Sequence, residues 1–69
     1  MTLFQEKIEE IREELEFEFT SRQFEIDEYI KQGIELANQE KDWTLDMKMD
    51  LIREYAAQQL EKTRADWEY

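Results

Sequence analysis

The sequence predicts an all-α protein, and three observations lead to that prediction. The chain has no proline and a single glycine in 69 residues, a composition that disfavours sheets joined by tight hairpins. Its apolar residues recur every three or four positions along nearly the whole length, which is helical spacing. Aromatic residues make up 13% of the chain, which argues against simple disorder. We therefore expect one small helical domain over residues 1–69.

The first apolar stripe predicts a helix that begins near residue 3. It consists of Phe4, Ile8, Ile11, Leu15 and Phe19. A second set follows at the same spacing and consists of Ile26, Tyr29, Ile30, Gly33, Leu36 and Ala37. At roughly 100° per residue, the second set keeps the phase of the first, apart from Leu36. This shared phase favours one continuous helix over about residues 3–38, which would be roughly 55 Å long.

The alternative is a break near Thr20–Ser21. The pattern Thr20-x-x-Gln23 reads as a capping box, which would start a new helix at this point. No glycine, proline or asparagine is present there to turn the chain. A break would give a compact three-helix bundle, whereas the continuous helix gives a long antiparallel hairpin.

A last helix is predicted over about residues 45–67. Thr44 is a suitable N-cap, and Asp46 places a negative charge in the first turn, where it suits the helix dipole. The stripe of this helix consists of Leu45, Met49, Ile52, Ala56, Leu60, Thr63 and Trp67. Four other apolar residues lie off the stripe, where they would cover the open end of the hairpin or contact a second copy: Trp43, Met47, Leu51 and Tyr69. Because long helices seldom stand alone, we expect the hairpin to self-associate as a homo-oligomer or to bind a partner.

The charge is concentrated in the first 28 residues. This segment has ten carboxylates and three cations, so it carries −7 of the net charge of −10. Such a field repels nucleic acid and anionic membranes and favours basic surfaces. We therefore expect no direct nucleic-acid binding and no membrane binding.

The composition gives no support to an enzyme. The chain has no cysteine and no histidine, which removes thiolate chemistry, the commonest transition-metal ligand and the usual general base. It also lacks a phosphate-binding glycine loop and a calcium-loop pattern. No catalytic residue, cofactor or metal is predicted. The absence of a secretory signal or a long apolar run makes the cytoplasm the expected location.

Two phenylalanines on the polar side suggest a contact surface. On a continuous helix, Phe17 and Phe24 are seven residues apart and lie opposite the apolar stripe, among carboxylates. An aligned aromatic pair can mark an interface. If the chain bends instead, both rings are expected to enter the core. The predicted partner-binding residues are Glu6, Glu9, Glu10, Glu13, Glu16, Phe17, Phe24, Asp27 and Glu28.

Two functions fit these features. The first is a non-enzymatic acidic interaction module, an inhibitor or adaptor that docks on a basic surface, for example that of a nucleic-acid-binding protein. Its carboxylates would then imitate a phosphate array. The second is a structural or regulatory homo-oligomerisation module, a dimeric four-helix bundle whose acidity keeps it soluble.

Overall fold

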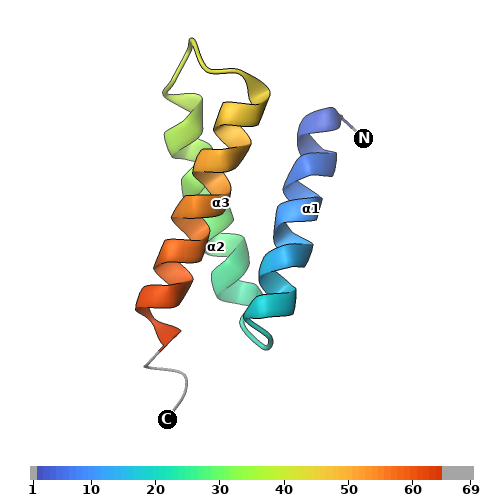
Figure 1. Cartoon of the computed structure of the whole chain (residues 1–69), viewed down its shortest axis with the longest axis vertical. Coiled ribbons are helices and arrows are strands. Elements are labelled where there is room, and N and C mark those ends of the chain that lie inside the picture. Colours follow the sequence, from blue (N-terminus) through green and yellow to red (C-terminus); the bar gives the residue numbers. More distant parts are fainter. Residues whose placement is uncertain (1, 65–69) are drawn as a thin grey trace.

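The computed structural model describes residues 2–64, and within this range the chain forms three α-helices and no strand. The helices are α1 (Leu3–Glu18), α2 (Gln23–Asn38) and α3 (Leu45–Lys62). In Figure 1, α1 and α3 run in the same direction and α2 runs opposite to both. The all-α prediction is confirmed.

The preferred prediction of one helix over residues 3–38 is wrong, and the three-helix alternative fits the structure. The helix stops at Glu18, and the chain reverses before Gln23. Ser21 makes this turn with φ of 69°, a left-handed conformation that costs a non-glycine residue about 1 kcal/mol. The reversal buries the α1 stripe against the other helices, and that burial offsets the cost.

The ends of the helices differ in how well their sequences cap them. Thr2 forms a capping box with Gln5 at the start of α1. At the start of α3, the backbone N–H of Met47 donates to the hydroxyl of Thr44 at 3.3 Å, so the predicted N-cap is confirmed. The capping box read at Thr20 does not form, because Arg22 is the N-cap of α2 and its side chain makes no cap hydrogen bond.

The core runs along the centre of the bundle and takes one stripe from each helix. Its buried apolar residues are Ile8, Ile11, Leu15, Phe19, Ile26, Ile30, Ala37, Met49, Ile52, Ala56 and Leu60. All of them belong to the predicted stripes. Trp67 and Tyr69, and the predicted extension of the last helix beyond residue 64, lie outside the described residues.

The helices do not contact one another equally. The interface between α2 and α3 is much larger than either interface of α1. Gly33 allows α2 to approach α3 closely, because a Cβ there would lie 3.2 Å from the Cα of Ile52. In Figure 1, α1 lies beside the α2–α3 pair, and the turn after α1 lies at the same end of the bundle as the end of α3.

Candidate interaction surface

The structure divides the predicted partner-binding residues between two helices. Those on α1 are Glu6, Glu9, Glu10, Glu13, Glu16 and Phe17, and those on α2 are Phe24, Asp27 and Glu28. The prediction that Phe17 and Phe24 lie on one face of a single continuous helix is therefore wrong. The reason is the break at residues 19–22, which places the two groups on antiparallel helices.

Both phenylalanines are nevertheless exposed. Phe17 has an exposed fraction of 88% and Phe24 of 78%, so the expectation that a bend would bring both rings into the core is also wrong. The helical period explains this result. Each ring lies on the side of its own helix opposite the buried stripe, so the reversal of the chain moves the rings without covering them.

The most regular acidic surface is on α1. Glu6, Glu10, Glu13 and Phe17 follow spacings of four, three and four residues, and all four side chains are exposed. We call this row the outer stripe of α1. Around Phe17 the surface forms an open apolar hollow, which Glu13, Glu14 and Glu18 also line. The end of the outer stripe thus combines an aromatic ring with a rim of carboxylates.

Two of the predicted acidic residues form ion pairs with Arg12, Glu9 within α1 and Asp27 across to α2. Arg12 lies between α1 and α2, where its Nη1 is 3.0 Å from an oxygen of Glu9 and its Nε is 2.9 Å from an oxygen of Asp27. Ion pairs also join α1 to α3, from Lys7 to Asp46 at 3.9 Å and from Arg53 to Glu14 at 3.1 Å. Such partly exposed pairs each contribute at most about 1 kcal/mol. Glu9 and Asp27 are accordingly less available to a partner than the outer stripe.

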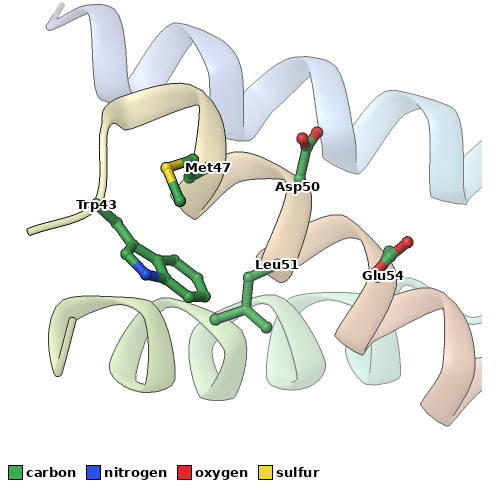
Figure 2. A pocket seen from close by; sticks show the side chains of 5 residues that line it. All are labelled: Trp43, Met47, Asp50, Leu51 and Glu54. Carbon is green, nitrogen blue, oxygen red and sulfur yellow. The ribbon is translucent and has the colours of Figure 1, made fainter.

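A second surface feature lies where the α2–α3 connection enters α3. Figure 2 shows the indole of Trp43 directed toward Leu51, with Met47 beside them. Asp50 and Glu54 lie at the edge of this apolar area. We call Trp43, Met47 and Leu51 the Trp43 patch. The sequence predicted these residues to lie off the stripe, and the structure leaves Met47 exposed and the other two half-buried.

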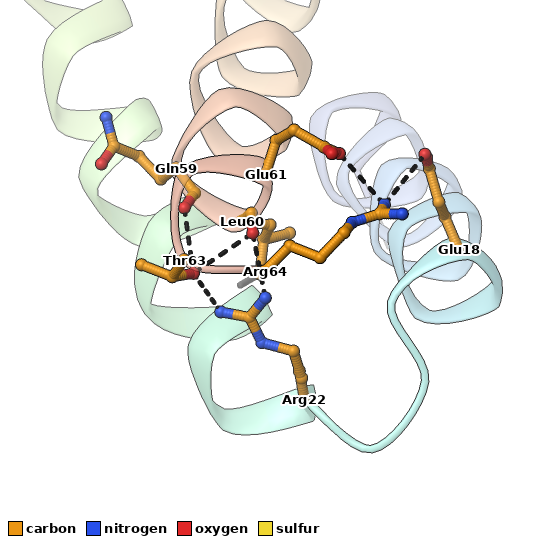
Figure 3. A network of polar contacts seen from close by, with 7 residues as sticks. All are labelled: Glu18, Arg22, Gln59, Leu60, Glu61, Thr63 and Arg64. Carbon is orange, nitrogen blue, oxygen red and sulfur yellow. Dashed lines mark hydrogen bonds and ion pairs between the residues drawn. The ribbon is translucent and has the colours of Figure 1, made fainter. Parts of the chain in front are cut away.

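Sequence reasoning missed a polar network at the opposite end of the bundle (Figure 3). Arg22 is buried, and its guanidinium donates to the carbonyl oxygen of Leu60 at 3.0 Å and to the hydroxyl of Thr63. Arg64 pairs with Glu18 at 3.6 Å and with Glu61 at 3.0 Å. The sequence signal was weak, because an arginine after a serine in a short connection does not reveal which distant helix end it will contact.

Between residues 2 and 64, no three carboxylates gather in an arrangement that could hold a metal ion. None of the three helices combines the length and the apolar character that a bilayer crossing requires. The chain matches no protein-family model, no curated protein and no solved structure.

Proposed function

We propose that this protein is a non-enzymatic acidic interaction module that acts in the cytoplasm and docks on a basic protein surface as an inhibitor or adaptor. The observation that supports this function best is the outer stripe of α1, in which three exposed carboxylates lead to an exposed phenylalanine. The carboxylates provide attraction and orientation, and the ring of Phe17 provides apolar area to bury.

The spacing of the stripe suits a partner that binds nucleic acid. Glu6 and Glu13 are separated by about 10 Å along the helix axis, and Glu10 lies between them. The three carboxylates are on average about 5 Å apart along this axis, whereas the phosphates of one strand of duplex DNA are about 3.4 Å apart. The outer stripe therefore offers a nucleic-acid-binding surface about two thirds of the linear charge density of one DNA strand.

The rest of the molecule supports this use of α1. The opposite side of the helix is fixed to the core through Ile8, Ile11 and Leu15, so the stripe is presented on a folded support. A rigid array needs less ordering on binding than a flexible acidic tail, and this favours affinity.

The experiment is a capture from cell lysate with duplex DNA as a competitor. Wild type should retain basic proteins at low salt, and DNA or high salt should release them. Glu6→Gln with Glu10→Gln and Glu13→Gln should lose most of these proteins, and Phe17→Ala should weaken their retention.

A matched control removes the same charge elsewhere. Glu35, Glu40 and Asp42 are exposed at the far end of α2 and in the connection to α3. Their replacement by Gln, Gln and Asn should leave capture close to the wild-type level. Equal losses in the two triple variants would mean that net charge alone retains the proteins, and the docking role of α1 would be rejected.

Homo-oligomerisation is the second candidate, and the Trp43 patch is the observation that favours it. An apolar patch with exposed Met47 at its edge is a suitable contact between copies. In that case Met47→Glu should give a monomer at every concentration by light scattering. A dimer that persists in this variant would show that the patch is not the contact.

A further inference from the structure

The α1 helix is attached to the bundle in a way that a second copy could reproduce. It contributes an apolar stripe, Phe4 to Phe19, and is joined to the other two helices by ion pairs from Lys7, Arg12 and Glu14. The α2–α3 pair is the more tightly packed unit, with the close approach at Gly33. The face that α1 covers therefore belongs to the two helices that pack most extensively on each other.

The connection between α1 and α2 is short and strained. Only residues 19–22 separate the two helices, and Ser21 is the one described non-glycine residue with positive φ. The far end of this hinge is fixed, because Arg22 is buried and bonded to the end of α3. Strained short hinges favour exchange of the attached element between copies.

The helical phase shows what the hinge can become. The buried stripes of α1 and α2 have the same phase on one continuous helix, and residues 19–22 include no proline or glycine. If the hinge becomes helical, both stripes lie on one side of a single rod. The α1 half then extends beyond its own bundle, and its stripe is left without a cover.

We propose that a second copy of this chain supplies that cover, so that two chains exchange α1. In the exchanged dimer, two long helices lie antiparallel, and the α1 half of each packs on α2 and α3 of the other. Since α1 and α2 are already antiparallel in one chain, this arrangement keeps their relative direction. The pairs Arg12–Asp27 and Arg53–Glu14 then form between chains with the same partners as within one chain.

The balance between the two forms depends on the hinge and on concentration. The monomer keeps Ser21 in the left-handed conformation, whereas the dimer releases that strain at both hinges. Against this gain, association costs the translational and rotational entropy of one molecule. This proposal does not depend on the docking function, since it concerns the covered side of α1 and not the outer stripe.

The first test changes Ser21 and measures the dimer dissociation constant by light scattering over about 1 µM to about 1 mM. Glycine tolerates the left-handed turn and disfavours the helix. Ser21→Gly should therefore raise the dissociation constant of the dimer by about tenfold for each hinge, or roughly a hundredfold for the two hinges together. Ser21→Ala, with its higher helix propensity, should strengthen the dimer several-fold. Equal constants for the two variants, or a wild type that stays monomeric over the whole range, would overturn the proposal.

The second test separates exchange from any other dimer. Arg12→Glu and Asp27→Arg each place like charges at the α1–α2 contact. An exchanged heterodimer of these two variants has two such contacts. In one, α1 of the Arg12→Glu chain meets α2 of the Asp27→Arg chain, so both charges are reversed and attract each other. In the other, the native Arg12 of one chain meets the native Asp27 of the other. Mixing the two variants should therefore give mainly heterodimer by native mass spectrometry, with a higher melting temperature than either variant alone.

The matched control uses a pair within one helix. Glu9 and Arg12 are both on α1, so mixing Glu9→Arg with Arg12→Glu restores no contact by exchange. This mixture should show a statistical distribution of species. A statistical distribution in the first mixture as well would overturn the proposal, even if both variants form dimers.

Discussion

The replacement of Arg22 should destabilise the protein more than that of any other described cation. Only 4% of its surface is exposed, and it makes two hydrogen bonds to the end of α3 across a separation of about forty residues. The last carbonyls of a helix have no partner within the helix, and a cation near them also suits the helix dipole. Arg22 therefore completes α3 while fixing the start of α2 (Figure 3).

The magnitude follows from these contacts. Hydrogen bonds from a charged group contribute about 1.5–3 kcal/mol, and Arg22→Ala also removes the packing of the aliphatic stem. We expect a loss of about 3 kcal/mol in the free energy of unfolding. A domain of this size has a total of about 3–10 kcal/mol, so the melting temperature should fall by about 10–20 °C.

The assay is urea and thermal unfolding followed by circular dichroism at 222 nm. Arg22→Lys keeps the charge but only part of the donor geometry, so its loss should be about half that of Arg22→Ala. Arg53→Ala is the matched control, because that arginine is about half exposed and its ion pair to Glu14 contributes at most about 1 kcal/mol. If Arg22→Ala cost no more than Arg53→Ala, the reasoning about a buried cap would be refuted.

A double-mutant cycle isolates the contact itself. The hydroxyl of Thr63 accepts from Arg22 and lies 3.1 Å from the carbonyl oxygen of Gln59, to which it donates. Thr63→Val removes both roles at nearly constant volume. Combined with Arg22→Ala, it should show a coupling free energy of about 0.5–1.5 kcal/mol, and additive losses would mean that the two side chains act separately.

Substitutions at Phe19, Phe17, Gly33 and Thr44 test the packing and the capping by the same unfolding assay. Phe19→Ala should lower the free energy of unfolding by about 3–4 kcal/mol, because the ring is buried. Phe17→Ala should change it by less than about 0.5 kcal/mol, because that ring is exposed. Similar losses in the two variants would contradict the assigned burial. Gly33→Leu should cost more than about 2 kcal/mol, because the side chain would push α2 away from Ile52. Gly33→Ala should change stability by less than about 1 kcal/mol, because its gain in helix propensity opposes the cost of the close contact. Thr44→Ala should cost about 1 kcal/mol by removing the cap of α3, and no loss would show that the cap is not needed.

The sequence was sufficient for the parts of the fold that depend on local pattern. The helix class, the start of α3 after Thr44 and the buried stripes all follow from periodicity and capping chemistry. The break at residues 19–22 was only an alternative, because Ser21 adopts a left-handed conformation that is usually signalled by glycine or asparagine. The reason for the break is tertiary, since it lets α1 cover the core, and periodicity within one segment does not contain that information.

The candidate surface was predictable to the same extent. That Phe17 would lie away from the core follows from the helical period alone. Two other contacts could not be predicted in this way, the pairing of Asp27 with Arg12 and the capping of α3 by Arg22. Both depend on which helices meet and in which direction they run. These contacts join residues whose separation in the sequence carries no periodic signal.

The two proposals use opposite sides of α1, so each can fail without the other. Phe17 and Phe24 lie opposite the buried stripes whether residues 19–22 turn or become helical, so alanine at both positions should leave the dissociation constant of the dimer unchanged. The outer stripe lies wholly on one helix, so Ser21→Gly should leave capture through α1 unchanged. A loss of capture in the Ser21 variant, with the outer stripe intact, would mean that docking requires the form in which Phe17 and Phe24 share one helical face. That single result would reject α1 alone as the docking element and would identify the exchanged dimer as the binding species.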